Sequence, residues 1–234
     1  MQVIKNALLA CISKFGYGVY RTDGFEVYST DRFRLTSLSC TIDPEYADYL
    51  KENSKILISR GLNKAHYGCG DSLFEDGWVN IDFKHDSPDS TEIYIGADLT
   101  SKHPFPPNHF IFSFAEDFLE HLTQDESLIF LSEAYRCLKP AGVLRLSFPG
   151  LRGVLQRHYL MSDYDGASLG REKAFTMWDH KHFYCEESLT IVAKHVGFSD
   201  IQFVPFGISA YKELRCLDSR ADQQDLNIYV ELTK

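Results

Sequence analysis

Two glycines and one aspartate have the spacing expected of a site for a ribose-bearing ligand. Gly68 and Gly70 directly follow a short apolar run that ends at Tyr67, and a second strand-like run, residues 78–81, leads into Asp82. Glycine lets the backbone turn tightly and come close to a ligand. The carboxylate of Asp82 can accept hydrogen bonds from both hydroxyl groups of a ribose. The order of strand, glycine turn, strand and acid therefore predicts that a ribose-bearing ligand binds at this turn.

The same stretch distinguishes two classes of such ligands. A dinucleotide site has the pattern G-x-G-x-x-G, with an acid roughly 20 residues further on. Here Leu73 stands at the third glycine position, and Asp82 comes only 12 positions after Gly70. A full helix and a pyrophosphate cradle do not fit in that gap, whereas S-adenosylmethionine has no pyrophosphate to hold. The glycine pair alone is also compatible with an ordinary tight turn after a buried strand.

Composition and charge restrict the partners. The 234 residues carry a formal net charge of −9, and 44% are apolar, without a run near the ~18 apolar residues of a membrane-spanning helix. Negative charge disfavours nucleic acid as the main partner, so we expect a soluble protein that binds neither nucleic acid nor a membrane. Six scattered cysteines, without a Cys-x-x-Cys motif, indicate reduced thiols in a cytoplasmic protein: Cys11, Cys40, Cys69, Cys137, Cys185 and Cys216.

Strand and helix signals alternate from about Lys55 onward, which predicts an α/β domain with a mostly parallel sheet. The clearest helices cover residues 125–138 and 186–196, where apolar residues recur at helical spacing. A long polar loop, residues 218–225, precedes the last strand and fits an antiparallel pair at one edge of the sheet. The expected strands are residues 56–59, 65–67, 79–82, 92–95, 110–114, 143–148, 201–205 and 228–232.

The connection between the strands 65–67 and 79–82 is unusually short. Residues 71–77 connect them, whereas a parallel crossover usually takes a dozen residues or more. This connector can hold one or two helical turns at most.

Five blocks of sequence follow one another after Lys64. They read GCG, GWVNIDF, ADLTSKHPFPPNHFIFSFAEDFLEHL, EAYRCLKPAGVLRLSFPGL and HKHFYCEESLTIVAKHVGF. In this order they resemble the class I S-adenosylmethionine-dependent methyltransferases. The chain is most similar to a small bacterial subgroup associated with methylation of polysaccharides or other small molecules, in which the first connector is also short. The ending KELRCLDSR, followed by NIYVEL, is similar to the C-terminal pattern of that subgroup.

The resemblance implies a Rossmann-like fold with a mostly parallel seven-stranded sheet, an antiparallel last strand and helices on both faces. It also implies that S-adenosyl-L-methionine binds at the carboxyl ends of the strands. By position, Asp82 holds the ribose, and Asp98 and Leu99 flank the adenine. The other implied cofactor contacts, near the methionine portion and toward the acceptor, are Tyr67, Gly68, Cys69, Gly70, Phe114, Ala115 and Glu116.

We therefore expect two parts in the chain. Residues 60–234 form the methyltransferase domain, with an insertion at about 151–180 over the active site. Residues 1–59 form an N-terminal extension that either covers the sheet or serves as a lid. Its expected elements are a helix over 3–15, a hairpin over 19–28 around Asp23-Gly24, and a short helix over 44–51 capped by Asp43.

Candidate catalytic residues follow the fourth implied strand and precede the last predicted helix. Methyl transfer depends on alignment of the reacting groups, and an oxygen acceptor also benefits from a base. His121 lies four positions after Asp117, so both share one face if residues 118–122 are helical, which suggests a base and a group that orients it. His182 lies where the family places acceptor loops. His121 could instead cap or pack its turn.

No metal site is expected from the sequence. A metal bound by His180 and His182 would need a third ligand, and the only other histidines nearby in sequence are His158 and His195.

The expected function is S-adenosylmethionine-dependent methylation of a small-molecule or sugar-type acceptor, most simply on oxygen. One departure from the family keeps an alternative open, because the subgroup often has Glu-His where this chain has Glu116-Asp117. The second interpretation is a non-catalytic protein that binds S-adenosylmethionine or S-adenosylhomocysteine. A nicotinamide-dependent oxidoreductase is the third, and Leu73 and the early Asp82 disfavour it.

Overall fold

A computed structural model describes residues 17–21, 25–29, 35–37, 44–83 and 93–234. The first strands, β1 (Tyr17–Arg21) and β2 (Phe25–Ser29), pair antiparallel, and β3 (Leu35–Ser37) pairs with β2. This confirms the hairpin predicted over residues 19–28. The predicted helix over residues 3–15 and the cap Asp43 lie outside the described residues.

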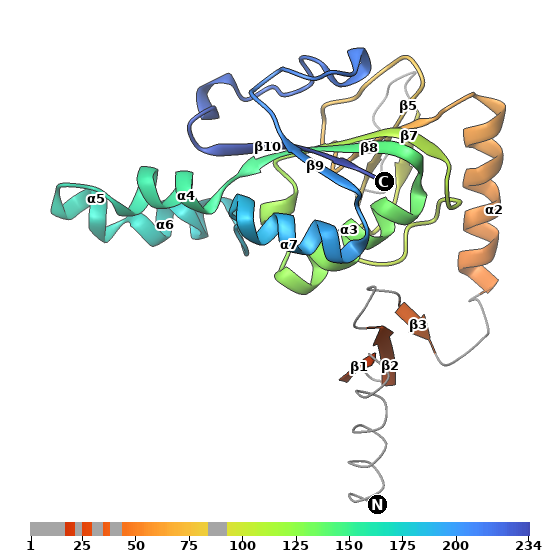
Figure 1. Cartoon of the computed structure of the whole chain (residues 1–234), viewed down its shortest axis with the longest axis horizontal. Helices are drawn as coiled ribbons and strands as arrows, with labels where there is room; N and C mark the ends of the chain where they lie inside the picture. The colour runs from red at the N-terminus through yellow and green to blue at the C-terminus, as the bar shows by residue number, and fades with distance from the viewer. Residues whose placement is uncertain (1–16, 22–24, 30–34, 38–43, 84–92) are drawn as a thin grey trace, which may run out of the picture.

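A seven-stranded sheet forms the centre of the protein (Figure 1). Its strand order is β6-β5-β4-β7-β8-β10-β9, and β10 is antiparallel to both neighbours, whereas the other pairs are parallel. This topology confirms the predicted Rossmann-like fold with one antiparallel strand. The strands are β4 (Lys64–Tyr67), β5 (Trp78–Asp82), β6 (Tyr94–Gly96), β7 (Phe110–Glu116), β8 (Leu138–Pro149), β9 (Asp200–Phe203) and β10 (Asn227–Thr233).

Residues 56–59 end a helix, so the strand predicted there is wrong. The helix α2 (Pro44–Ser59) continues eight residues beyond the short helix predicted over 44–51. The run Ile56-Leu57-Ile58 resembles a strand, but its burial follows a helix: Leu57 is 0% exposed and Ile58 is 72% exposed. Asn53, one turn before Leu57, is buried and donates a hydrogen bond to the segment after β6. Tertiary packing of one helical face therefore overrides the local strand signal.

The two predicted long helices are confirmed, each within one residue of its expected bounds. They are α3 (Gln124–Cys137) and α7 (Glu186–Val196), and both pack below the sheet in Figure 1. Thr123 begins α3 with a capping box, in which its hydroxyl and the side chain of Glu126 satisfy each other's main-chain N–H groups. Gly197 ends α7 with a φ of 121°, a conformation that favours glycine.

The strand β8 separates the core into two layers, because successive side chains point to opposite faces of a sheet. Leu144, Leu146 and Phe148 belong to the larger cluster, which also includes apolar residues of α3 and α7. Val143 and Arg145 point to the other face. There the short connector and a C-terminal loop around η4 (Lys212–Leu214) pack on the sheet through Trp78, Phe114, Val143, Leu214, Phe74, Phe112 and Leu217.

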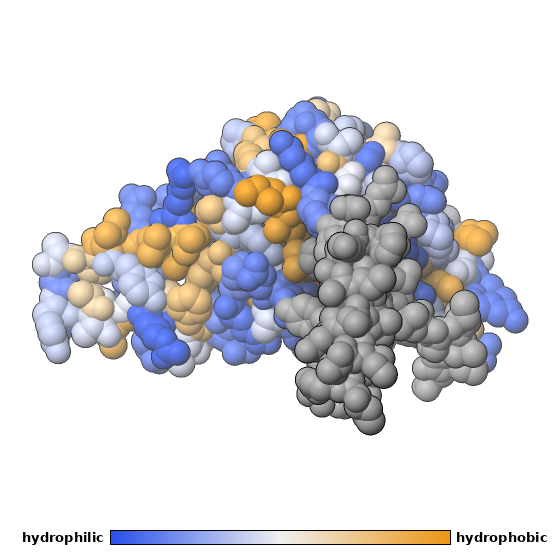
Figure 2. Space-filling model, turned by 60° about the horizontal axis from the view of Figure 1, so that its bottom comes forward, coloured by the Kyte–Doolittle hydropathy of each residue, from blue (hydrophilic) through white to orange (hydrophobic). Residues whose placement is uncertain are grey.

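A helical arm, defined as residues 151–178, projects from the end of β8 (Figure 1). Its exposed hydrophobic side chains give the apolar surface seen at the left of Figure 2. The arm falls in the region of the predicted insertion, and the role of that insertion stays a prediction. Its elements are α4 (Leu151–Val154), η2 (Leu155–Tyr159), α5 (Tyr164–Ser168), α6 (Gly170–Ala174) and η3 (Thr176–Trp178).

Two further findings bear on the expected environment of the protein. Across the described ranges, no helix combines the length and the apolar character needed to cross a bilayer. Cys137, Cys185 and Cys216 are free thiols. Burial raises the pKa of Cys137 to about 12, which keeps this thiol protonated.

We expect the protein to lose stability as the pH falls from 6.5 toward 4. Burial lowers the pKa of both His66 and His103 from 6.5 to about 4, because a low-dielectric interior disfavours the imidazolium. The unfolded chain therefore takes up these protons first. The stability that each neutral ring contributes is complete above pH 6.5 and is lost progressively down to pH 4. At pH 5 the loss is about 2 kcal/mol per histidine at most.

Urea unfolding at pH 7 and pH 5 of the wild-type protein and of His103→Gln measures this contribution. His103 Nε2 lies 3.2 Å from the main-chain oxygen of Leu99, so it donates to that oxygen, and the glutamine amide can replace this donor without titrating. The variant should lose less stability between the two pH values than the wild type does. An identical pH dependence of both proteins would contradict the expectation.

Candidate functional site

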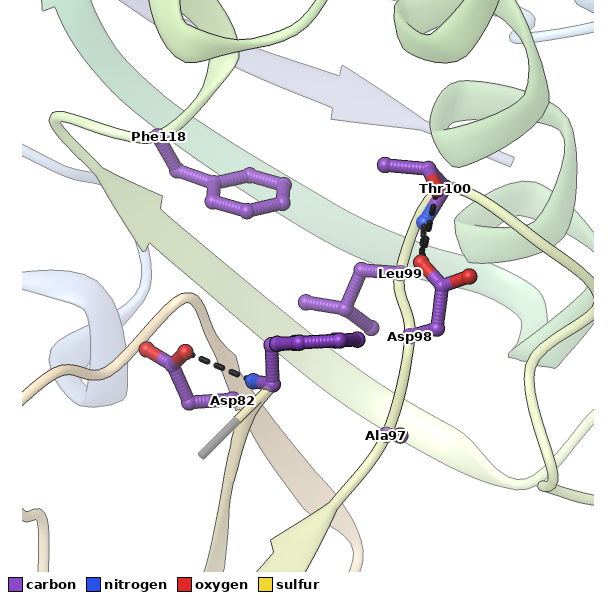
Figure 3. Close-up of a pocket in the computed structure, with 7 residues that line it drawn as sticks. Asp82, Ala97, Asp98, Leu99, Thr100 and Phe118 are labelled. Carbon is purple, nitrogen blue, oxygen red and sulfur yellow. Dashed lines mark hydrogen bonds between the residues drawn. The ribbon is translucent and has the colours of Figure 1, made fainter. Parts of the chain in front are cut away.

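A cavity of about 260 Å³ opens at the carboxyl ends of β5 and β6 (Figure 3). Its walls come from the end of β5, the segment after β6 and a residue after β7. Ligands of open α/β sheets bind at the carboxyl ends of the strands, so this is the expected position for a cofactor. The lining residues are Asp82, Phe83, Ala97, Asp98, Leu99, Thr100 and Phe118.

The glycine bend beside this cavity needs both of its glycines. Gly68 has a φ of 63° and Gly70 a φ of 53°, in the left-handed region that other residues enter only with strain. A Cβ atom on Gly68 would lie 2.5 Å from Cδ2 of Phe118, so only glycine fits under that ring. No atom lies within 4 Å of a Cβ atom built on Gly70. The bend thus leaves main chain open to the close approach of a ligand.

Asp82 is hydrogen-bonded directly to the glycine bend. The main-chain N–H of Gly70 donates to Oδ2 at 2.7 Å, and that of Phe83 donates to Oδ1 at 2.6 Å. A carboxylate has about four lone-pair sites, so each oxygen can accept one further hydrogen bond. Two such acceptors, held in place by the main chain, fit the two hydroxyl groups of a ribose.

Asp98 and Leu99 line the same cavity from the segment after β6 (Figure 3). Asp98 Oδ1 accepts hydrogen bonds from Thr100 N at 2.8 Å and from Thr100 Oγ1 at 2.6 Å, which holds the turn. The side chain of Leu99 is 4% exposed and forms an apolar wall. An apolar wall with a carboxylate beside it suits a flat base that carries an amino group.

Five other residues implied as cofactor contacts do not line the cavity. Four of their side chains are buried in the core: Tyr67, Cys69, Phe114 and Ala115, at 0%, 4%, 1% and 2% exposure. Glu116 accepts hydrogen bonds from the main-chain N–H and the hydroxyl of Ser219. A role of these five residues in cofactor binding stays a prediction.

The cavity also includes residues that sequence reasoning missed. Phe83 follows Asp82 in sequence, and Thr100 follows Leu99. Their position next to a predicted cofactor contact is the signal that could have indicated them. Phe118 lies against Gly68 only because β7 and β4 are adjacent in the sheet. No local sequence pattern indicates that contact.

The structure places Asp117 next to a cation that the sequence analysis did not identify. Asp117 Oδ2 forms an ion pair with Arg220 Nε at 2.8 Å. Partial burial raises the pKa of Asp117, and the charge of Arg220 opposes that shift. His121, the predicted partner, is close enough to lower the pKa of Asp117 electrostatically. Among the described residues, however, the side chain that forms an ion pair with Asp117 is Arg220.

The side chains of Glu120, His121 and His180 come together beside Asp117. His121 lies on η1 (Leu119–His121), and its ring centroid is 5.0 Å from that of His180. Glu120, also on η1, is 1% exposed, and burial raises its pKa to about 8. The main-chain oxygen of Glu120 accepts a hydrogen bond from Lys181 N at 2.7 Å, which attaches the loop before α7 to this turn.

His182, the third predicted catalytic residue, lies apart from that cluster. Its half-buried ring packs edge-on against Tyr184, with ring centroids 4.6 Å apart. Burial lowers the pKa of His182, so the ring is neutral at neutral pH. Its catalytic role stays a prediction.

The connector after the bend argues against a dinucleotide. Residues 70–71 and 76–77 form turns, and residues 72–75 between them are irregular. The amide oxygen of Asn80 accepts a hydrogen bond from Phe74 N at 2.8 Å, which holds this connector. A dinucleotide pyrophosphate binds at the N-terminus of a helix that follows the glycine turn. This connector contains no helix, so the bend suits a nucleoside without a pyrophosphate.

Comparisons with known proteins match part of the chain to a methyltransferase family. Residues 80–146 match the family model described as a methyltransferase domain. No curated protein is significantly similar to the chain in sequence. An S-adenosylmethionine-dependent methyltransferase structure from Mesorhizobium loti has 16% identity and a TM-score of 0.52, over 77% of this chain and 96% of that one. At this identity the likeness is one of fold.

Two other solved structures are similar over comparable lengths. A methyltransferase of this class from Archaeoglobus fulgidus has 14% identity and a TM-score of 0.47, over 82% of this chain and 100% of that one. One from Methanosarcina mazei has 15% identity and a TM-score of 0.49, over 82% and 98%. The family match over residues 80–146 and the strand order together indicate a methyltransferase domain with a Rossmann-like fold.

Proposed function

We propose that the protein transfers a methyl group from S-adenosylmethionine to an oxygen atom of a small-molecule or sugar-type acceptor. One observation carries the proposal. The carboxylate of Asp82, held by the N–H groups of Gly70 and Phe83, borders a nucleoside-sized cavity. Phe118 also lines this cavity, and Asp117 and His121, which belong to a cluster of titratable side chains, flank Phe118 in the chain.

The residues of the cavity would hold the cofactor as follows. Asp82 accepts hydrogen bonds from the ribose, and Asp98 and Leu99 flank the adenine. Gly68 and Gly70 let the methionine portion approach the main chain. When bound, S-adenosylmethionine supplies an activated methyl group on its sulfonium. The protein then contributes alignment and exclusion of water, which can provide most of the rate.

The acceptor would enter from the side of the helical arm. A second cavity, of about 570 Å³, lies between the arm and the loop before α7, and it includes His180 of the cluster beside Asp117. Either Asp117 or His121 would take the proton of an acceptor hydroxyl there, and the other residue of the pair would orient that base. The cavity is lined by Tyr159, Arg171, Phe175, Thr176, Asp179, His180 and Lys181.

A labelling experiment tests the proposed function. The protein is incubated with S-adenosylmethionine labelled at the methyl group and with an extract of metabolites and glycan precursors. We expect a labelled methyl ether, identified by mass spectrometry. Cofactor binding without any labelled product would favour the non-catalytic interpretation, and a methylated amine would overturn the assignment to oxygen.

Asp82→Ala is expected to weaken S-adenosylmethionine binding by about 1–3 kcal/mol, because charge-assisted hydrogen bonds to the ribose are lost. Isothermal titration calorimetry measures the change. Glu75→Ala is the matched control, because Glu75 is an exposed acid on the connector and outside the cavity. Equal affinities of the wild type and Asp82→Ala would show that the ribose lies elsewhere.

His121→Ala is expected to lower turnover by about 100-fold or more, which is the usual range for loss of acid–base assistance. Its affinity for S-adenosylmethionine should stay within about twofold, because His121 does not line the cofactor cavity. Steady-state kinetics and calorimetry separate the two effects. His195→Ala, a histidine on α7, is the control. Unchanged turnover in His121→Ala would remove this residue from the mechanism.

A further inference from the structure

We propose that Glu120, His121 and His180 form a binding site for a divalent transition-metal ion, for which Zn²⁺ is the best match. Each residue offers one ligand atom, and these atoms all lie within 4.8 Å of one another. Two of the residues are on η1, and His180 is on the loop that hydrogen-bonds to this turn. The fold therefore brings two imidazoles and a carboxylate to one point.

The carboxylate of Glu120 is the first argument for an ion. Its residue is 1% exposed, and its Oε2 atom is buried without a hydrogen-bond partner among the described residues. A buried polar atom without a partner is costly. A cation between Glu120 and the two rings would satisfy this oxygen.

The tautomer of His180 also favours a metal ion at this cluster. Its Nδ1 atom lies 2.8 Å from the main-chain oxygen of Ala174. A carbonyl oxygen only accepts, so Nδ1 carries the proton and Nε2 presents its lone pair. Metal-binding histidines almost always donate their other ring N–H to a carbonyl, a carboxylate or water. His180 is thus oriented as a ligand before any ion binds.

The donor set indicates the kind of metal. Two histidines and one glutamate are ligands of catalytic zinc sites, in which the remaining position is left for water or substrate. Hard cations such as Mg²⁺ and Ca²⁺ prefer sites made of oxygen ligands. The half-buried rings of His121 and His180 leave the cluster accessible from the second cavity, which His180 lines.

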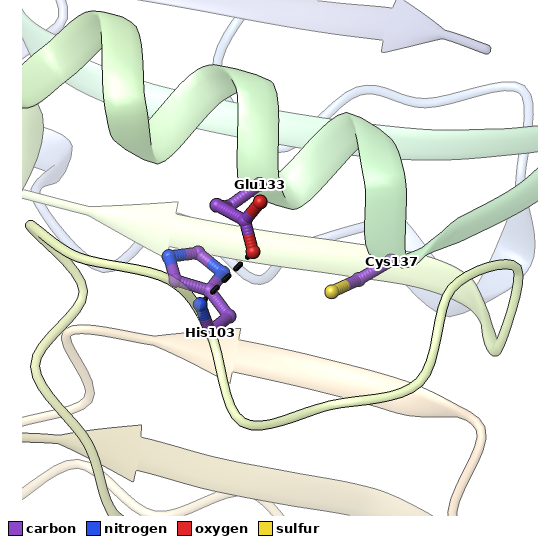
Figure 4. Close-up of side chains that lie close together, drawn as sticks. All are labelled: His103, Glu133 and Cys137. Atoms are coloured by element: carbon purple, nitrogen blue, oxygen red, sulfur yellow. Dashed lines mark hydrogen bonds between the residues drawn. The ribbon is translucent and has the colours of Figure 1, made fainter. Parts of the chain in front are cut away.

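A second group of possible ligands, His103, Glu133 and Cys137 (Figure 4), lies beside the guanidinium of Arg136. Arg136 donates to both oxygens of Glu133, at 2.7 to 3.1 Å, so its guanidinium already neutralises this carboxylate. The ring of His103 is 0% exposed and donates to a main-chain oxygen. A metal ion there would be repelled by the adjacent guanidinium.

The proposal goes beyond the proposed function and can be tested apart from it, because ion binding needs neither the cofactor nor the acceptor. A metal ion at this cluster differs from the prediction made from the sequence, which was that the protein has no metal site. With an ion present, His121 is a ligand, and Asp117 remains as the proton acceptor of the pair.

Metal binding to the full-length protein, dialysed against chelator, is the test. We expect one Zn²⁺ per chain by calorimetry and a visible absorption band when Co²⁺ is added in its place. Glu120→Gln and His180→Asn should each weaken Zn²⁺ binding by about 100-fold or more, since even outer-shell partners change metal affinity by 10–100-fold. His195→Ala should bind as the wild type does, and so should His182→Ala, since His182 lies outside the cluster.

The two variants are chosen to preserve the fold. Gln has the shape of Glu120, and the amide of Asn can donate to Ala174 in the place of Nδ1 while Nε2 is removed. Thermal unfolding of each variant without metal checks this. Absence of Zn²⁺ binding by the wild type, or wild-type affinity in a folded Glu120→Gln or His180→Asn, would overturn the proposal. If one variant is unfolded, the other and the anomalous scattering of a Zn²⁺-soaked crystal give the answer.

Discussion

Replacing Arg145 with methionine is expected to lower the free energy of unfolding by about 3–5 kcal/mol. The guanidinium is completely buried, and it donates to both oxygens of Asp218 and to Glu231, which is opposite Arg145 in the β8–β10 pair. Without Arg145, two carboxylates would be buried without their cation. Removal of one partner from a buried ion pair costs more than the pair contributes, because the remaining charge is desolvated.

The same substitution should also disturb the site. Asp218 accepts a hydrogen bond from Gly207 N at 2.7 Å, and Arg145 itself donates to the main-chain oxygen of Ile208 at 2.9 Å. These contacts hold the C-terminal loop that carries Ser219, which binds Glu116, and Arg220, which binds Asp117. We therefore expect turnover to fall together with stability.

Chemical denaturation of Arg145→Met and of Arg152→Met measures the difference. Arg152 also forms an ion pair, with Glu187, but their side chains are 74% and 60% exposed. Exposed pairs contribute about 0–1 kcal/mol, so Arg152→Met should be close to the wild type. Equal losses in the two variants would show that burial of Arg145 does not determine its contribution.

Gly68→Val is expected to remove measurable S-adenosylmethionine binding and to destabilise the protein. A left-handed backbone costs a residue with a Cβ about 1–2 kcal/mol, and overpacking adds about 1–3 kcal/mol. The overpacking arises because a Cβ atom at this position would lie 2.5 Å from the ring of Phe118. Phe118 lines the cofactor cavity, so its displacement changes the cavity as well as the bend. Calorimetry for binding and urea unfolding for stability measure both effects.

Gly61→Val is the matched control for the backbone strain. Gly61 has a φ of 66°, close to the 63° of Gly68, but nothing lies within 4 Å of a Cβ atom built there. This variant should lose only the strain energy and keep its affinity for the cofactor. If Gly68→Val kept wild-type affinity, the bend would have no part in cofactor binding.

The main sheet could be predicted because its signals are local and repeat along the chain. Apolar strands, helical spacing in α3 and α7, and a capping glycine at Gly197 each carry their own evidence. The failure at residues 56–59 has the opposite cause. Ile56, Leu57 and Ile58 favour a strand locally, but burial of Leu57 on one face of α2 decides the structure.

The cofactor side of the site was more predictable than the acceptor side. Asp82 and the glycine bend lie within one stretch of 15 residues, 68–82, so their relation is visible in the sequence. Phe118, Arg220 and the cluster around Glu120 depend on contacts between distant segments. Sequence spacing associated His180 with His182, whereas the fold pairs His180 with His121, which is 59 positions earlier.

A crystal structure of the protein with S-adenosylhomocysteine tests whether Asp82 and the glycine bend hold the cofactor. We expect both ribose hydroxyl groups within hydrogen-bond distance of the carboxylate of Asp82, with the adenine against residues 97–100. The amino-acid portion should lie along the main chain of Gly68 and Gly70. A nucleoside bound elsewhere, or a bend filled by a protein side chain at saturating ligand, would contradict this assignment.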